Sequence, residues 1–216
     1  MKSTFIFILI FLLCVILTLR CHKKADPLCP QFYLTTIAYA QSHFQDQRVI
    51  DQDQNGIGEF GSFQNLYEIS FRNPTIKTEF HFLRKDLPGL AINNGIVEYK
   101  GYYFIMYLPK YNGKPYNGEE LPSCNANDAK YQEKSWICYA WPSEDRDHDL
   151  RCLVISQDSN VYVFANRNKR YIGMKRKPNP WSALDIDSPS LRHLNGKIGI
   201  NHNSTDGEDW ELLLPG

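Results

Sequence analysis

Residues 51–60 carry oxygen-bearing side chains at a spacing that could bind a metal ion. Two aspartates and an asparagine occupy alternate positions, as the first ligands of a calcium-binding loop do, and a glycine follows where such loops turn sharply. Because Ca2+ takes carboxylate and carbonyl oxygens, the pattern predicts a calcium site. The candidate ligands are Asp51, Asp53, Asn55, the main-chain carbonyl of Ile57, and Glu59.

The same stretch differs from a complete EF-hand. The last position of an EF-hand loop is a glutamate that binds with both oxygens, and Ser62 stands there in this chain. No paired helix pattern follows the stretch. Asp, Asn and Gly also favour tight turns without any metal, so a solvated turn that ends a helix is the alternative interpretation.

Other titratable residues give weaker predictions. The acidic residues within 143–149 and 206–209 fit charged loops better than a second cation site, because alternate residues of a coil have no fixed geometry. The six histidines are scattered without ligand spacing, although His202 lies near Asp206. Motifs of zinc proteases, α/β-hydrolases and phosphate-binding loops do not occur in the sequence. A secreted hydrolase with a dispersed site is therefore the least favoured function.

An apolar segment near the N-terminus predicts that the chain is attached to a membrane. Residues 5–19 contain no charged side chain, and as a helix they rise roughly 22 Å, between a signal-peptide core and a span of the roughly 30 Å bilayer core. Small residues expected before a signal-peptidase cut are missing, and Arg20 precedes Cys21 where a lipoprotein signal has a small residue. We expect residues 1–25 to be a retained single-pass anchor, with cleavage and lipidation as alternatives.

The cysteines favour a body outside the cytoplasm. The part of the chain after the anchor has an even number of them and no Cys-x-x-Cys motif, which fits disulfides in an oxidising compartment better than a zinc site. The basic residues after the apolar segment favour the opposite orientation, in which the body lies in the cytoplasm. The alternative is that some thiols are simply buried small side chains. The candidates for pairing, with connectivity left open, are Cys29, Cys124, Cys138 and Cys152.

A helical period follows the anchor. From about residue 30 to residue 47, apolar residues recur at helical spacing, which predicts an amphipathic helix packed on the rest of the body. The apolar stripe consists of Tyr33, Ile37, Ala40 and Phe44. The polar residues expected elsewhere on the helix are Thr36, Gln41, Ser42 and Gln45.

Further along the chain, apolar and aromatic runs predict β-strands. Residues 96–99 and 102–108 flank Lys100-Gly101, which predicts a hairpin with a tight turn. A second hairpin is predicted over residues 157–160. The other expected features are a short helix or turn at 61–67, a long loop at 109–128 suited to binding, a strand at 136–141, a short edge strand at 170–173 and a small helix near 181–185.

These elements predict an α+β protein in which an amphipathic helix packs on an antiparallel β-sheet. We expect one domain over residues 26–216, with a β-rich head at about 60–175 and an irregular C-terminal part. After the basic N-terminus, the chain carries 20 basic and 24 acidic residues. A mildly acidic body lacks the clustered positive charge that nucleic-acid binding requires, and we expect no nucleic-acid partner.

The order of features resembles type IV pilins and type II secretion pseudopilins. The matching segments are Ala38–Phe44 with residues 51–60, Gly101–Phe104 with Tyr107–Pro109, and Trp136–Pro142, which together look like the body of bacterial prepilin-type proteins of unassigned role. A prepilin leader ends in glycine and the apolar segment after it contains a glutamate, and neither feature is present around residues 5–19. The resemblance implies a pilin-like head on a simple membrane anchor.

From these observations we expect a non-enzymatic protein of the cell envelope. It would be held in the cytoplasmic membrane by residues 5–19, with an extracytoplasmic head that serves as an accessory or structural component beside other envelope or secretion-system proteins. The alternative is a calcium-stabilised module that binds a peptide or glycan through the 109–128 loop. Apart from Ca2+, no cofactor is expected.

Overall fold

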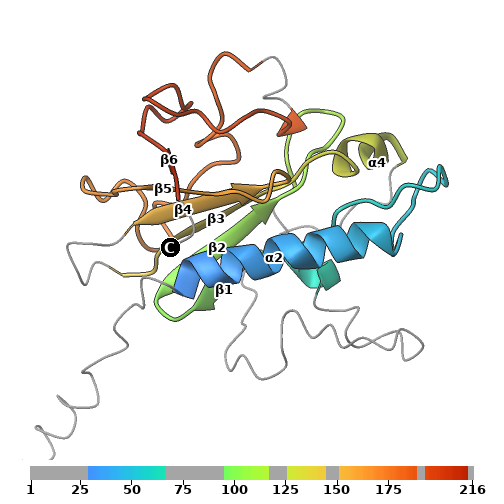
Figure 1. Cartoon of the computed structure of the whole chain (residues 1–216), viewed down its shortest axis with the longest axis horizontal. Coiled ribbons are helices and arrows are strands. Elements are labelled where there is room, and N and C mark those ends of the chain that lie inside the picture. The colour runs from blue at the N-terminus through green and yellow to red at the C-terminus, as the bar shows by residue number, and fades with distance from the viewer. Residues whose placement is uncertain (1–28, 67–94, 117–125, 145–150, 189–192, 214–216) are drawn as a thin grey trace, which may run out of the picture.

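The computed structural model describes residues 29–66, 95–116, 126–144, 151–188 and 193–213. Within them the class is α+β, as predicted: a few helices accompany one six-stranded antiparallel sheet (Figure 1). The helices are α2 (Cys29–Asp46) and α4 (Ala126–Gln132). The strands are β1 (Ile96–Tyr99), β2 (Tyr102–Tyr107), β3 (Ile137–Pro142), β4 (Cys152–Ser156), β5 (Val161–Phe164) and β6 (Glu211–Leu212).

The strands follow one another across the sheet in chain order, each antiparallel to the next. Both predicted hairpins are confirmed. In the first, Lys100 and Gly101 have φ of 46° and 82°, the left-handed conformation that a two-residue hairpin turn requires. In the second, β4 and β5 pair across the turn at residues 157–160. Alternating apolar residues therefore point to opposite faces of the sheet.

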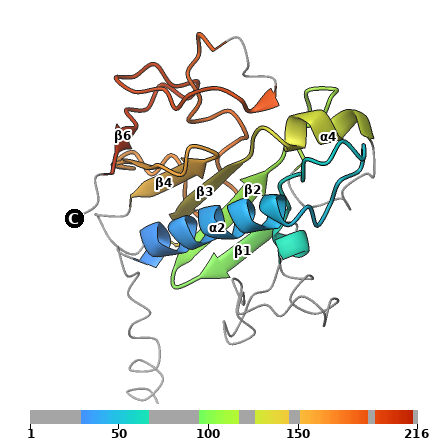
Figure 2. The same cartoon turned by 45° about the vertical axis from the view of Figure 1, so that its right-hand side comes forward.

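Helix α2 covers one face of the sheet, as Figures 1 and 2 both show. The predicted stripe is confirmed, since Tyr33, Ile37, Ala40 and Phe44 are all buried in one cluster with side chains of the strands. One expectation about this helix is wrong. Gln41 was placed on the polar side, but it is fully buried, because it lies four residues after Ile37 and three before Phe44 on the inward face.

The C-terminal residues cover the other face of the sheet. A second buried cluster joins strand residues such as Tyr139 and Trp141 to Leu184, Leu194 and Trp210 from the irregular C-terminal part. In Figures 1 and 2 this layer, drawn in orange and red, lies across the sheet from α2. The sheet is thus enclosed on both faces, which explains why every residue of β3 and β4 is buried.

Two small predicted elements in the C-terminal part are wrong. Residues 170–173 do not add an edge strand, because Ile172 pairs only with Arg176 in an isolated bridge and the edge is formed by β6. Residues 181–185 form turns rather than a helix, with Leu184 bridged to Ile198. Apolar side chains of these two segments pack on the sheet. The backbone that carries them is irregular, so the sequence has no periodic pattern from which the structure could be predicted.

The long loop expected at 109–128 is only partly a loop. Tyr116 pairs with Leu108 at its start, and α4 begins at Ala126. A single helical turn at 63–66 agrees with the helix or turn predicted at 61–67. The apolar segment 5–19 lies outside the described residues, and none of the described helices is long and apolar enough to cross a membrane.

Candidate functional site

The loop that follows α2 is held together by its own aspartates. The N–H of Asn55 donates to Asp51 Oδ1 at 3.1 Å and to Asp53 Oδ1 at 3.2 Å, and the N–H of Gly56 donates to Asp51 Oδ2 at 3.1 Å. Asn55 Oδ1 accepts the N–H of Ile57 at 2.7 Å. These side chains close successive turns, as Asp and Asn do in loops without a ligand.

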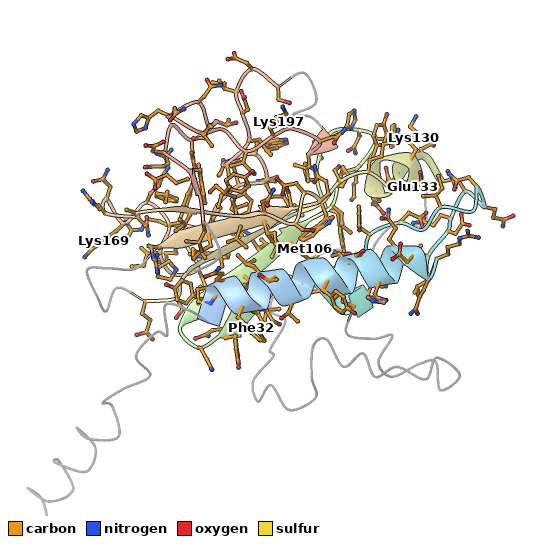
Figure 3. The ribbon with its side chains drawn as sticks, in the orientation of Figure 1. Phe32, Met106, Lys130, Glu133, Lys169 and Lys197 are labelled. Atoms are coloured by element: carbon orange, nitrogen blue, oxygen red, sulfur yellow. The ribbon has the colours of Figure 1, made fainter. Side chains whose placement is uncertain are left out.

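Asn55 also fastens the loop to α4. Its Nδ2 donates to Glu133 Oε1 at 2.8 Å, although the two residues are 78 positions apart. Gln45, in the last turn of α2, donates to the main-chain oxygen of Glu133 at 2.7 Å. The N–H of Phe60 donates to the main-chain oxygen of Gln132 at 3.0 Å. Figure 3 shows Glu133 at the end of α4 beside this loop. The end of α2, the loop and the end of α4 therefore form one junction.

Glu59 lies beneath the loop and is fully buried. Its Oε1 accepts the N–H of Gln52 at 2.8 Å, and its own N–H donates to the oxygen of Ile50 at 3.0 Å. Its Oε2 has no hydrogen-bond partner, and neither has the buried Oε1 of Gln52. Burial raises the pKa of the Glu59 carboxyl, and the nearby charges of Asp51 and Glu133 raise it further.

Gln41 joins α2 to the chain beyond the loop. Its Oε1 accepts the N–H of Gly61 at 2.9 Å, and its Nε2 donates to the oxygen of Gly61 at 2.6 Å and to Met106 Sδ at 2.9 Å. The amide thereby satisfies two buried main-chain groups, as a neighbouring strand would. A Cβ at Gly61 would lie 3.0 Å from Phe44 Cζ, so the close approach favours glycine.

The structure brings together some of the predicted calcium ligands. Asp51, Asp53 and Asn55 converge on the same loop, whereas Ile57 is half exposed and Glu59 is turned inward. Among the described residues, no three His, Cys, Asp or Glu side chains are already arranged to hold a metal ion. The residues that sequence reasoning missed are Gln41, Gln52 and Glu133. Only Gln41 had a local indication, its helical spacing from Ile37 and Phe44.

Two of the four candidate disulfide cysteines have described side chains, and these two lie on opposite faces of the sheet. Cys138 and Cys152 are free, buried thiols, and they belong to the clusters on opposite faces. A disulfide between these two is thus excluded by the alternation of the strands. Burial raises the pKa of both thiols well above its ordinary value. Cys124 and the side chain of Cys29 lie outside the described residues.

The carboxylates near the C-terminus have a packing role that the sequence did not indicate. Asp206 Oδ2 accepts the hydroxyl of Tyr171 at 2.7 Å, and its Oδ1 accepts the hydroxyl of Ser204 at 2.7 Å and the indole N–H of Trp210 at 3.3 Å. Glu208 forms an ion pair with Arg170 at 3.1 Å. These contacts join residues 170–171, which follow β5, to residues 204–210 of the C-terminal layer. Residues 145–150 of the other acidic run lie outside the described part.

The described histidines lie apart from one another. His202 lies 3.8 Å from Asp209 on the surface rather than beside Asp206. His193 stacks on Tyr131 with ring centroids 4.0 Å apart, and its main-chain oxygen, not its ring, accepts the hydroxyl of Ser135 at 2.7 Å. His43 lies 3.0 Å from the hydroxyl of Tyr39 on the outer side of α2. These positions give a dispersed hydrolase site no support.

Three tyrosines lie in or just after the segment 109–128 that was predicted as a binding loop, and one of them is more than half exposed. Tyr111 is 53% exposed, and its N–H is held by Asp128 Oδ1 at 2.8 Å. Tyr116 is buried under Lys110, and Tyr131 is covered on one side by His193. Tyr111 is therefore the aromatic side chain around which a surface contact could form.

Comparison of the chain with protein-family models, with curated proteins and with solved structures finds no match.

Proposed function

We propose that this chain is a non-enzymatic, membrane-anchored protein of the cell envelope, a pilin-like or pseudopilin-like accessory or structural component. The observation that carries the proposal is the packing of α2, whose inward face is buried against the sheet. This helix begins at Cys29, shortly after the apolar segment 5–19 ends. An apolar segment followed by a helix that supports an antiparallel sheet is the arrangement that the pilin resemblance implies.

The enclosure of the sheet supports a structural role. In the described part of the chain, α2 fills one face and the C-terminal layer fills the other. The strand side chains are used for packing, and the polar side chains beneath the junction bind main-chain groups. A rigid head of this kind suits presentation of a surface to other envelope or secretion-system proteins, and the surface contacts rather than a cleft would carry function.

Membrane anchoring by residues 5–19 is tested by extraction. The full chain with a C-terminal epitope is expressed in a bacterial host, and its membranes are washed with alkaline carbonate, which removes peripheral proteins. We expect the protein to stay in the membrane fraction with an intact mass that includes residues 1–25. Release by carbonate, or a mass that lacks these residues, would contradict a retained anchor.

A matched pair of variants makes the extraction specific. Leu12→Arg with Leu13→Arg places two charges in the apolar segment, each costing about 2.5–3.5 kcal/mol near the middle of a bilayer. This variant should move to the soluble fraction. Leu12→Ile with Leu13→Ile changes the same positions but keeps them apolar, and it should remain with the membrane. If both variants stay, the segment is not the anchor.

A calcium-stabilised module that binds a peptide or glycan is the second candidate function, and the exposed ring of Tyr111 favours it. Exposed aromatic rings are common contacts in such surfaces. On a glycan array, Tyr111→Ala should abolish any binding that the full chain shows. Tyr39 on α2 is equally exposed, at 53%, so Tyr39→Ala is the matched control and should keep it. No binding by the full chain, or equal loss in both variants, would rule out this surface as a glycan site.

A further inference from the structure

A run of basic side chains follows β5. Residues 165–177 contain six Lys and Arg residues, and no Asp or Glu occurs between Asp158 and Asp185. The chain after residue 25 has more acidic than basic residues, so positive charge is concentrated in this segment. The basic residues are Arg167, Lys169, Arg170, Lys175, Arg176 and Lys177.

Two turns of defined structure carry these side chains. Asn166 closes the first turn, since its Nδ2 donates to the main-chain oxygen of Tyr171 at 2.6 Å and its Oδ1 accepts the N–H of Tyr171 at 3.2 Å. The second turn, residues 172–176, is closed by an isolated β-bridge. The N–H of Gly173 in this turn donates to the oxygen of Pro142 in β3 at 2.9 Å. The basic residues are therefore held on a fixed base at one end of the sheet.

These turns carry positive charge that is not neutralised by the described part of the chain. Arg167, Lys175 and Arg176 are exposed, and their side chains form no ion pair with the described residues. Arg170 differs, because it is paired with Glu208. An apolar side chain, Met174, lies beside the cations in the second turn and is 39% exposed. Exposed cations around an exposed apolar side chain suit the surface of a membrane, which is charged at the headgroups and apolar beneath them.

The two turns lie at the end of the head where α2 begins. Gly173 is bonded to Pro142, and Pro142 pairs with Tyr102 where β2 starts. Tyr33, near the start of α2, and Tyr99, at the end of β1, have ring centroids 5.5 Å apart. The start of α2, the first hairpin turn and the basic turns thus share one end of the sheet.

The proposed anchor joins the head at this end. Figure 3 shows Lys169 toward the end of the molecule at which α2 begins, and Lys130 toward the opposite end. Residues 20–28 separate the apolar segment from α2, and nine residues span at most roughly 30 Å when fully extended. With residues 5–19 in a bilayer, this end of the head is held within about that distance of the lipid surface.

We propose that the two basic turns of residues 165–177 bind the anionic phospholipid headgroups of the membrane that holds the anchor. The inference rests on the proposed membrane anchor and adds a second contact, which fixes the orientation of the head on the bilayer. Each Lys or Arg near an anionic membrane strengthens binding roughly fivefold. Nucleic acid is a less suitable partner, because proteins that bind single strands use exposed aromatic rings, and Tyr171, the aromatic residue of this segment, is buried.

Lysine modification in reconstituted vesicles tests the proposal. The full chain is inserted into vesicles of phosphatidylcholine, with or without phosphatidylglycerol, treated briefly with an amine-acylating reagent and analysed by peptide mass spectrometry. We expect the modification rate of Lys175 to fall at least about fivefold in the vesicles that contain the anionic lipid. Lys197, which is exposed in the C-terminal layer and lies away from the basic turns, should change by less than about twofold. In 1 M NaCl the Debye length falls to about 3 Å, so the protection of Lys175 should disappear.

A matched pair of double variants assigns the protection to the basic turns. Arg167→Gln with Arg176→Gln removes two of their cations and keeps Lys175 as the reporter, so most of the protection should be lost. Arg48→Gln with Lys134→Gln removes two exposed cations near the opposite end of α2 and should keep the protection. Equal loss in both pairs would overturn the proposal.

The same vesicles distinguish a failure of the anchor from a failure of the basic turns. Flotation with neutral vesicles reports the anchor, whereas the difference in Lys175 modification between the two lipid compositions reports the basic turns. Equal modification of Lys175 in both kinds of vesicle would overturn the proposal. Protection of Lys175 by a short DNA duplex in neutral vesicles, without protection by phosphatidylglycerol, would also overturn it and favour a nucleic-acid partner.

Discussion

Glu59 is the residue whose environment departs most from the one its side chain prefers. A carboxylate that is fully buried and lies near Asp51 and Glu133 is disfavoured in its charged form, so the pKa in the folded protein lies above the ordinary value of 4.5. The folded state then binds a proton more tightly than the unfolded state. The stability gained from this tighter proton binding is fully present below about pH 4.5. It is lost as the pH rises through the raised pKa of Glu59 in the folded protein.

This linkage gives a prediction for calcium-free protein. Glu59→Gln cannot lose a proton, so its unfolding midpoint should exceed that of the unmodified chain by an amount that grows as the pH rises above about 4.5. Other carboxylates titrate in both proteins and cancel from the difference. The measurement is a pair of thermal melts in EDTA across a pH series. A difference that stays constant with pH would show that the pKa of Glu59 is the same in the folded and the unfolded protein, and would contradict the raised pKa.

Gln41 gives a second prediction at the same scale. Gln41→Met keeps the length of the side chain but leaves the N–H and the carbonyl of Gly61 without their partners in a buried position. We expect the free energy of unfolding to fall by about 2–4 kcal/mol. Gln47→Met at an exposed position just after α2 should change it by less than about 0.5 kcal/mol. Urea unfolding measures both, and equal effects would remove the proposed role of the amide.

These two residues also mark the limit of sequence reasoning about the site. The dense oxygen pattern at residues 51–59 predicted either a calcium loop or a turn after the helix, because Asp and Asn at alternate positions are informative locally. The structure has a turn-rich loop there, and calcium binding stays a prediction. Glu133 could not be found, since it meets Asn55 only through the fold, 78 positions away. Gln41 was misplaced because polar residues of an amphipathic helix are assumed to be exposed, although its spacing from Ile37 placed it on the inward face.

At the scale of elements, α2 is held by its inward side chains rather than by its intrinsic helix preference. Phe44 is 5% exposed and packs in the cluster with the strands, whereas Phe32 in the same helix is 76% exposed and points away from the sheet in Figure 3. The two phenylalanines therefore offer a matched comparison of burial within one helix.

Phe44→Ala should lower the free energy of unfolding by about 3–5 kcal/mol, because it removes a buried ring and leaves a cavity beside Gly61. Phe32→Ala should change it by about 0.5 kcal/mol or less. Denaturant unfolding of both variants gives the comparison. A similar loss in both would mean that the outer side of α2 is also covered in the protein.

The strands could be predicted because alternation and turn residues are local features. Lys100-Gly101 fixed one hairpin, and the four residues 157–160 fixed the other. The C-terminal layer could not be predicted, since Leu184, Leu194 and Trp210 come from turns without a period and are placed by bonds such as those of Asp206. The edge position of β6 likewise depends on contacts far apart in the chain.

For the whole molecule, the sheet is shared by two layers, and each layer covers one buried thiol. Cys138 faces α2 and Cys152 faces the C-terminal layer. Burial raises the pKa of both thiols, so neither should react with a thiol reagent in the native protein. Because removal of either layer exposes the common sheet, we expect the two cysteines to become reactive together.

Pulsed alkylation across a urea series, read by peptide mass spectrometry, distinguishes the two thiols from the remaining cysteines. Coincident labelling of Cys138 and Cys152 is the expected result. Labelling of Cys152 at clearly lower urea would show instead that the C-terminal layer opens independently of α2, and the head would then consist of two units.

We propose that this folded head lies outside the cytoplasm on a membrane anchor. Protease treatment of spheroplasts that carry the full chain with a C-terminal epitope tests it most directly. We expect the epitope to be removed from intact spheroplasts, while a cytoplasmic marker in the same cells is spared. Survival of the epitope until detergent opens the membrane would place the head in the cytoplasm, as the basic residues after the apolar segment would favour, and would contradict an extracytoplasmic head.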